Sequence, residues 1–381
     1  MKRNGSDRTR ARRRLSLILI LIPIALLLGT MPGTALAAPD DGVAKKSMFL
    51  DLGGAPAEEI AARVQTICAE HRDPNNDNYI MNVVLVGVVD QLGDLRVDQL
   101  RAVLPHVPGG GQSTCFENVF VGPTQLDVAP LPWKTRPDFP QNLEPWCADS
   151  PYCGGILTPS WRWDNVEANR EAADLFLGFV DLHYPRIRAN VNWYVTYEAY
   201  FDWLGDNAYS EDVRNGYTAY LLEMVRAYHQ ALLYAGEPAA SASRAVLWSP
   251  AYESPYYAHS PLELNHIRDN LRHMFHSIQA TAAGEGINRG VDWLDMQDKL
   301  GQTDCFSVEC YLGVKQWYDF LATVNFPEFS FASLRVNMEL FSSNVPGPDP
   351  NEHMARQNFY EANGIPIGAS WELRFWSGPR L

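Results

Sequence analysis

The chain has 381 residues, of which 46% are hydrophobic and 20% are charged, a composition that excludes a mainly disordered, fibrous or coiled-coil protein. Its formal net charge of -14 argues against a general role in binding nucleic acid or acidic membranes, because a large anion repels both. The length is sufficient for one large domain or two smaller ones.

The N-terminal segment has the layout of an export signal. Basic residues between Arg8 and Arg14 precede an apolar run from Leu15 to Leu28, and the small-residue motif Ala35-Leu36-Ala37 follows as a cleavage site. We therefore expect residues 1–37 to be a signal peptide and the mature chain to begin near Ala38. An uncleaved membrane anchor is the alternative, although no later stretch approaches the ~18 apolar residues that a second span would need.

All 6 cysteines lie in the expected mature chain, where an even number favours disulfides. The short spacings favour the pairs Cys147–Cys153 and Cys305–Cys310, which leaves Cys68 for Cys115. This pairing is one of many that six cysteines allow.

From residue 48 onward, extended apolar runs alternate with amphipathic helical patterns. Strands are predicted over Met48–Leu52, Tyr79–Val89, Val119–Val121, Arg186–Tyr197, Ala245–Ser249, Val291–Met296, Phe329–Leu340 and Pro366–Leu373. Helices are predicted over Ala57–Ala69, Val97–Leu104, Val213–Tyr234, Leu262–Ala283, Val308–Val324 and Met354–Ala362, with another starting at Val166.

Strands that alternate with helices indicate a parallel sheet, and eight such units predict a (β/α)8 TIM barrel. We expect residues 38–381 to form this barrel as a single domain. An open doubly wound sheet is the alternative. It usually has a Gly-rich phosphate turn after its first strand, and Asp51-Leu52-Gly53-Gly54-Ala55 resembles such a turn only faintly.

A loop-like insertion of about residues 123–163 follows the third predicted strand. Its prolines, from Pro123 to Pro159, block regular helix and central strand. Four tryptophans in or beside it suggest a lid or a wall of a binding site, or rings that fasten the loop to the barrel: Trp133, Trp146, Trp161 and Trp163.

In a barrel of this kind, the active site is built at the carboxyl ends of the strands. The fourth predicted strand ends at Glu198 and the seventh at Glu339. Alternation places Asn192, Tyr194, Thr196 and Glu198 on one face, and Arg335, Asn337 and Glu339 likewise on one face. Two carboxylates at one mouth are what glycoside hydrolysis needs, since one protonates the leaving oxygen while the other attacks the anomeric carbon or activates a water.

These two glutamates resemble the layout of the superfamily of retaining glycosidase barrels. Three motifs are similar to those of its little-characterised, secreted, glycosidase-like members: Trp248-Ser249-Pro250, Gln297-Asp298-Lys299-Leu300-Gly301 and Asn337-Met338-Glu339-Leu340-Phe341. The resemblance covers roughly residues 186–376. It implies a glycoside hydrolase without a cofactor, in which Glu198 is the acid/base and Glu339 is the nucleophile.

The superfamily usually has Asn before its acid/base, whereas this chain has Tyr197 there. Asp298 and Glu372 therefore stay open as alternative acids. Trp371 fits the tryptophan on which such barrels stack sugars, because a flat ring packs against the C–H face of a pyranose. The remaining candidates for substrate binding are Tyr197, Trp248, Gln297, Asp298 and Asn337, with core packing as the alternative for any tryptophan.

We expect a secreted enzyme with a carbohydrate substrate, no nucleic-acid partner and no stable membrane association after signal cleavage. Two other functions stay open. A sugar-binding barrel without chemistry would hold one glutamate in a salt bridge. A metal-dependent hydrolase would combine Asp298 with the helix that carries His266, His273 and His276, although neither a CxxC nor an HExxH motif indicates a metal.

The segment Asp73-Pro74-Asn75-Asn76-Asp77 mimics the start of a calcium loop. Asn78 replaces the glycine that such a loop requires, and Val84 replaces its last glutamate. We interpret the segment as a polar turn, and we expect no bound metal.

Overall fold

The computed structural model describes residues 46–53, 55–70, 80–90, 92–112, 114–123, 159–197, 199–205, 210–326, 329–340 and 350–371. The predicted signal peptide, most of the insertion with Trp133 and Trp146, the turn at residues 73–77, Glu198 and Glu372 lie outside the described residues. The predictions made for them stay predictions.

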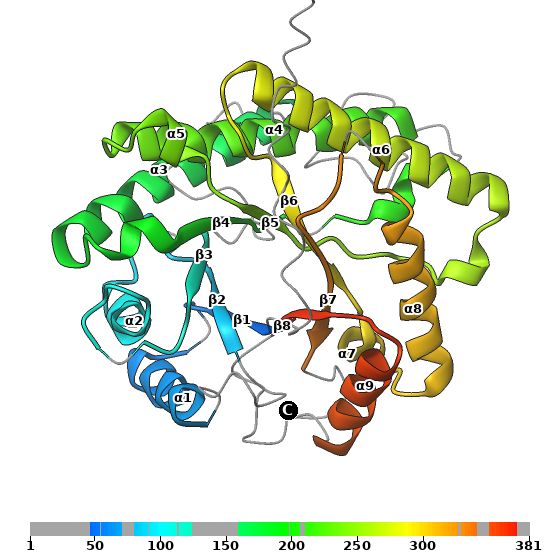
Figure 1. Ribbon diagram of the computed structural model, residues 1–381, viewed down its shortest axis with the longest axis horizontal. Helices are drawn as coiled ribbons and strands as arrows, with labels where there is room; N and C mark the ends of the chain where they lie inside the picture. The colour runs from blue at the N-terminus through cyan, green and yellow to red at the C-terminus, as the bar shows by residue number, and fades with distance from the viewer. Residues whose placement is uncertain are drawn as a thin grey trace, which may run out of the picture. The chain divides into compact units, whose positions relative to one another are not determined.

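The described residues form a closed barrel of parallel strands in the order β1 to β8, with β8 pairing back to β1 (Figure 1). The strands are β1 (Lys46–Asp51), β2 (Ile80–Val86), β3 (Asn118–Gly122), β4 (Val191–Val195), β5 (Val246–Trp248), β6 (Val291–Gln297), β7 (Ser333–Glu339) and β8 (Ile367–Trp371). Each predicted strand has its counterpart, so the TIM-barrel prediction is confirmed and the open sheet is excluded.

Helices between the strands surround this barrel (Figure 1). They are α1 (Ala57–Glu70), α2 (Val97–Val103), α3 (Pro159–His183), α4 (Ser210–Tyr234), α5 (Ala239–Ala242), α6 (Pro261–Gly284), α7 (Leu300–Thr303), α8 (Val308–Ala322) and α9 (Pro350–Ala362). Within the part of the chain that the structure describes, no helix is both long enough and apolar enough to cross a membrane.

Side chains alternate between the inside of the barrel and the layer beneath the helices, as strand geometry requires. The Tyr194 ring lies edge-on to Phe49 of β1, with centroids 5.0 Å apart, in a small apolar cluster of strand side chains. Its neighbour Trp193 stacks on Tyr228 of α4, with centroids 4.6 Å apart. The core therefore consists of an inner cluster and a larger one between strands and helices.

The barrel also contains a buried ion pair between β6 and β7. Arg335 of β7 contacts both oxygens of Asp295 on β6, through Nε at 2.9 Å and Nη2 at 3.0 Å. On β8, a Cβ at Gly368 would overlap this carboxylate, so glycine leaves the room that the pair occupies. The polar side chains of β6 and β7 are thus directed into the barrel, as the alternation predicts.

Several predicted boundaries are wrong, among them the start of the seventh strand, which is Ser333 and not Phe329. The fourth strand is limited to β4, because Ile187–Asn190 form a 3-10 turn before it. The predicted insertion of 123–163 is too long, because α3 begins at Pro159 and includes Trp161 and Trp163. Proline at the start of a helix costs no hydrogen bond, since the first N–H groups have no partner within the helix.

Two of the expected disulfides are confirmed. Cys68 at the end of α1 is bonded to Cys115 before β3, and Cys305 is bonded to Cys310 at the start of α8. The expected third pair, Cys147–Cys153, lies outside the described residues.

Candidate active site at the carboxyl ends of the strands

Glu339 is the last residue of β7 and lies at the carboxyl end of the barrel. Its side chain is 2% exposed, and its Oε2 accepts a hydrogen bond of 2.9 Å from the backbone N–H of Gln302 in α7. A backbone donor stabilises the ionised form of a carboxylate and fixes its direction. Glu339 is therefore a firmly held carboxylate at the end of the barrel where such folds carry their chemistry.

Asp298, directly after β6, is enclosed between the end of β7 and α9. It has no exposed surface, and its carboxylate accepts hydrogen bonds from Arg356 Nη1 at 2.9 Å and from the Tyr360 hydroxyl at 3.0 Å. The backbone N–H groups of Glu339 and Leu300 donate to its other oxygen. Burial raises the pKa of Asp298, and the nearby Arg356 charge lowers it.

This enclosure argues against the roles that the sequence suggested for Asp298, those of an alternative acid and of a substrate-binding residue. A buried carboxylate with four protein donors has no face left for a sugar or for a leaving oxygen. Arg356 also donates to the backbone carbonyl of Glu339, so the ion pair holds both polar backbone groups of that residue. The structure therefore places Asp298 as a support of Glu339.

Gln297 and Asn337 are brought together below the mouth, around Ser249 at the end of β5. Asn337 Nδ2 donates to Ser249 Oγ at 3.0 Å, and Gln297 Nε2 donates to the Ser249 carbonyl at 2.9 Å. Asn337 Oδ1 is buried and accepts no hydrogen bond from the residues that the structure describes. An acceptor left open in this position suits a water molecule or a substrate hydroxyl.

The end of β4 carries a second fixed segment. Trp248 Nε1 donates to the Tyr197 carbonyl at 3.2 Å, and the Ala251 N–H donates to the Ala199 carbonyl at 2.7 Å. Both neighbours of Glu198 along the chain are thus held by the segment that follows β5. Thr196, at the end of β4, has a buried hydroxyl that makes no hydrogen bond within the described residues.

Trp248 and Tyr197 do not gather with Glu339. Trp248 is 1% exposed, and its ring contacts Tyr217 of α4 and Phe275 of α6, which places it between the barrel and the helices. The half-buried Tyr197 ring contacts Trp161 and Tyr220, with centroids 5.4 and 5.5 Å away. Both rings therefore pack against helices, and Trp161 fastens the start of α3 to the barrel.

Trp371 ends β8 and pairs with Glu339 of β7 in the sheet register. The register brings its backbone beside the predicted nucleophile, as expected for a strand-eight residue at the mouth. Its side chain lies outside the described residues, so the sugar-stacking role stays a prediction.

Sequence reasoning missed Lys299 and Tyr200. Lys299 follows Asp298, and its Nζ lies 3.3 Å from the Tyr200 hydroxyl and 4.4 Å from the centre of the Tyr200 ring. A lysine after a strand carries no signal by itself. Its position inside the Gln-Asp-x-x-Gly motif, next to a strand end, is the feature that could have marked it.

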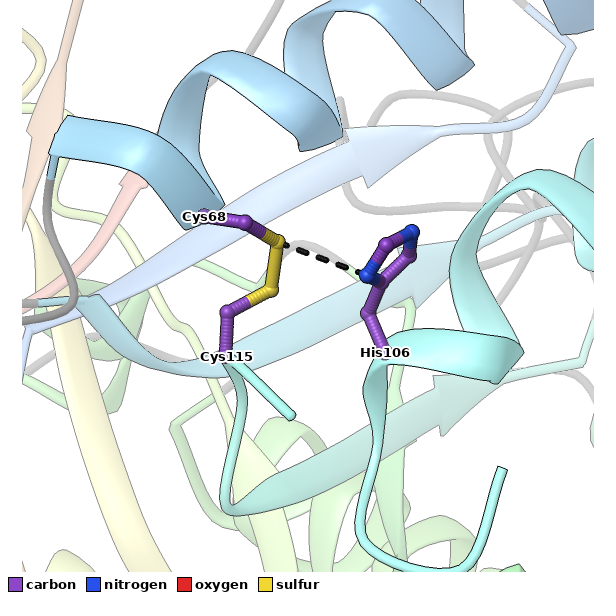
Figure 2. A group of neighbouring side chains, drawn as sticks. All are labelled: Cys68, His106 and Cys115. Atoms are coloured by element: carbon purple, nitrogen blue, oxygen red, sulfur yellow. Dashed lines mark hydrogen bonds between the residues drawn. A yellow bond between two sulfur atoms is a disulfide. The ribbon is translucent and has the colours of Figure 1, made fainter. Parts of the chain in front are cut away.

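The metal-dependent alternative gains no support from the arrangement of side chains. Asp298 is paired with Arg356, and the histidines of α6 form no group with it. Within the described ranges, the group of side chains with metal-ligand spacing is Cys68, His106 and Cys115 (Figure 2). His106 Nδ1 lies 3.6 Å from Cys68 Sγ, but the two sulfurs are bonded to each other and offer no thiolate.

Comparison with known proteins finds a similarity of fold alone. No family model matches the chain, and no curated protein matches its sequence. One similar solved structure is a GH39 beta-xylosidase from Caulobacter crescentus, at 14% identity and a TM-score of 0.40, covering 90% of this chain and 66% of that one. The GH39 enzyme from Xanthomonas axonopodis pv. citri is similar at 13% identity and a TM-score of 0.42, covering 90% of this chain and 62% of that one.

A third similar structure is PbGH5A, a glycoside hydrolase family 5 enzyme from Prevotella bryantii B14. It has 10% identity and a TM-score of 0.40, and the match covers 87% of this chain and 89% of that one. The chain spans about two thirds of the length of the two GH39 structures. Likeness at this level transfers neither an activity nor the role of any residue.

Proposed function

We propose that this chain is a secreted glycoside hydrolase that uses Glu339 as nucleophile and Glu198 as acid/base. The observation that carries the proposal is the setting of Glu339. It lies at the mouth of a TIM barrel, its carboxylate accepts a backbone hydrogen bond, and a buried ion pair holds its main chain. A nucleophile must be oriented toward one atom of the substrate, and this support limits its freedom to move.

The second carboxylate in the proposal belongs to the end of β4. Tyr197 and Ala199, on either side of Glu198, are held by hydrogen bonds from Trp248 and Ala251. A retaining mechanism needs the two carboxyl groups ~5–5.5 Å apart, whereas inversion needs ~6.5–9.5 Å to admit a water. We propose retention.

Open acceptors near Glu339 support a carbohydrate substrate. Asn337 Oδ1 lies two residues from Glu339 on the same face of β7, and the Thr196 hydroxyl lies two residues before Glu198. Sugar hydroxyls can donate to both. The disulfides Cys68–Cys115 and Cys305–Cys310 support export, because such bonds persist in oxidising compartments.

The test is hydrolysis of a panel of polysaccharides and aryl glycosides by the chain starting at Ala38. Glu339→Gln and Glu198→Gln are the test variants. Glu285→Gln is the matched control, because Glu285 caps the end of α6 and is paired with Arg226 on the outer surface. We expect each test variant to lose several orders of magnitude in kcat, and the control to keep its activity.

Proton NMR of the first product reports the anomeric configuration. Retention supports the two roles as assigned, whereas inversion would replace the nucleophile by a general base. Activity that survives in Glu339→Gln would refute the assigned site. Binding of a glycan without any hydrolysis would favour the sugar-binding barrel.

A further inference from the structure

The backbone of Lys299 has a conformation that is rare for a residue other than glycine. Lys299 and Asp304, at the two ends of α7, are the non-glycine residues with positive φ in the part of the chain that the structure describes. Lys299 has φ 55° and ψ 13°, a left-handed conformation that costs energy for a residue with a Cβ. Such conformations gather at ligand sites, where the surrounding structure enforces them.

The surroundings of Lys299 tie it to the proposed catalytic centre on both sides. The preceding residue, Asp298, accepts a hydrogen bond from the Glu339 N–H, and Gln302, three residues later, donates to the Glu339 carboxylate. The Lys299 side chain extends toward Tyr200, which follows Glu198 by two residues. Lys299 therefore links the segment around Glu339 to the segment that carries Glu198.

The charge of Lys299 is unusual for its place. The two buried arginines of this region each have a carboxylate partner, Asp298 for Arg356 and Asp295 for Arg335. Within the described residues, the contacts of the Lys299 ammonium are with the Tyr200 hydroxyl and ring. In a chain with a net charge of -14, a half-buried ammonium that has no carboxylate partner among the described residues is an available site for an anion.

Aromatic rings lie beside this ammonium. Tyr200 and Trp203 are both half-buried, and their centroids are 4.8 Å apart. Trp203 Nε1 donates to Glu253 Oε2 at 2.8 Å, which fixes the orientation of the indole. A fixed aromatic face next to a cation can hold the C–H face of a sugar ring and a charged substituent of that ring together.

We propose that Lys299 recognises an anionic substituent, a carboxylate or a sulfate ester, on a sugar unit next to the cleaved bond. This inference rests on the proposed function and narrows its substrate class to acidic glycans. Lys299 supplies the charge, Tyr200 fixes the ammonium, and the Tyr200–Trp203 pair offers the stacking face. The left-handed backbone conformation of Lys299 directs its side chain from the end of β6 toward Tyr200.

The test measures binding by calorimetry and hydrolysis by kinetics on matched oligosaccharides. The pairs are oligogalacturonate with its methyl ester, and a sulfated galactan oligosaccharide with its desulfated form. The variants are Lys299→Met and Lys299→Arg. Lys315→Met is the control for charge, because Lys315 lies on α8 and is paired there with Asp319.

We expect Lys299→Met to weaken binding of an acidic member about ten- to hundredfold and to leave its neutral counterpart within about twofold. Lys299→Arg keeps most of the preference for the acidic over the neutral oligosaccharide, and Lys315→Met keeps all of it. Added salt reduces this preference in the wild type. The member that responds, uronate or sulfate, identifies the anion.

Three results would overturn the inference. The first is that Lys299→Met loses binding affinity equally for both members of a pair, and the second is that it keeps the wild-type preference for the acidic member. The third is that the wild type binds no acidic oligosaccharide better than its neutral form. Hydrolysis of neutral glycosides that depends on Glu339 would keep the proposed function even then. Binding of an acidic glycan that depends on Lys299, without hydrolysis, would keep the inference and reject the catalysis.

Discussion

Replacement of Arg356 tests whether the ion pair of Asp298 and Arg356, which contacts the backbone of Glu339, supports the end of β7. Arg356→Met keeps most of the side-chain volume but leaves Asp298 as a buried carboxylate without its cation. Arg356 and Asp298 both have no exposed surface, and their N–O distance is 2.9 Å. Breaking a buried pair from one side costs about 3–5 kcal/mol, because the remaining charge is left uncompensated.

The pH dependence gives the effect a sign. Burial raises the pKa of Asp298 and the charge of Arg356 lowers it, so Arg356→Met raises this pKa further. A carboxyl whose pKa is raised on folding favours the folded state below its unfolded pKa of about 3.9, and that contribution is lost as the pH rises through the folded pKa. The variant should therefore lose more stability at pH 8 than at pH 5.

The assay is equilibrium unfolding in urea, followed by tryptophan fluorescence at both pH values. Asp298→Asn and the double variant complete the cycle, and the double variant should be more stable at pH 8 than Arg356→Met alone. We expect the kcat for hydrolysis by the folded variant to fall. The Glu339 carbonyl loses its donor, and Asp298, which accepts from the Glu339 N–H, loses the cation that positions it. A loss below about 1 kcal/mol that does not change with pH would refute the reasoning.

Two further groups give opposite pH dependences. Burial raises the pKa of Asp292 to about 7 even though Arg289 is 2.8 Å away, so folding stability is lost as the pH rises through about 7. Asp292→Asn should raise the free energy of unfolding above that pH by about 3 kcal/mol, as urea titrations at pH 5 and 8 would show; no gain at pH 8 would contradict it. Burial lowers the pKa of His353 to about 3, so folding stability is lost as the pH falls below about 6.5. His353→Leu should remove up to about 4 kcal/mol of this acid sensitivity, and a variant as acid-sensitive as the wild type would show that other groups cause it.

The fold could be predicted because its signals are local. Each strand is an apolar or alternating run bounded by polar or turn residues, and each large helix has its own periodicity, so neither depends on knowing the tertiary partners. The failures occurred where local rules give two answers. Residues Ile187–Asn190 alternate apolar and polar side chains as a strand does, but they form a 3-10 turn. Pro159 blocks a helix in its interior but is well placed at its start.

The site could be predicted only to the level of strand ends. Alternation correctly placed Arg335 and Asn337 inside the barrel, but it could not separate a tryptophan that faces a substrate from one that faces the helices. Trp248 packs on Tyr217 and Phe275, which are 31 and 27 residues away along the chain in opposite directions. Lys299 was missed because its significance arises from a backbone conformation and from a contact with Tyr200, neither of which a single sequence displays.

Asp298 and Glu339 show why residue type and position at a strand end do not define a role. Both are carboxylates directly at the ends of neighbouring strands, and both are buried. Asp298 faces the guanidinium of Arg356 on α9, 58 residues further along the chain, and it also accepts from the Tyr360 hydroxyl and from two backbone N–H groups. The Glu339 carboxylate accepts from the backbone N–H of Gln302, which orients the group. An oriented carboxylate at the mouth of the barrel can act on a substrate, and the Asp298–Arg356 pair supplies rigidity. The two carboxylates therefore differ in role because Arg356 pairs with Asp298, which makes that arginine the most informative residue to change.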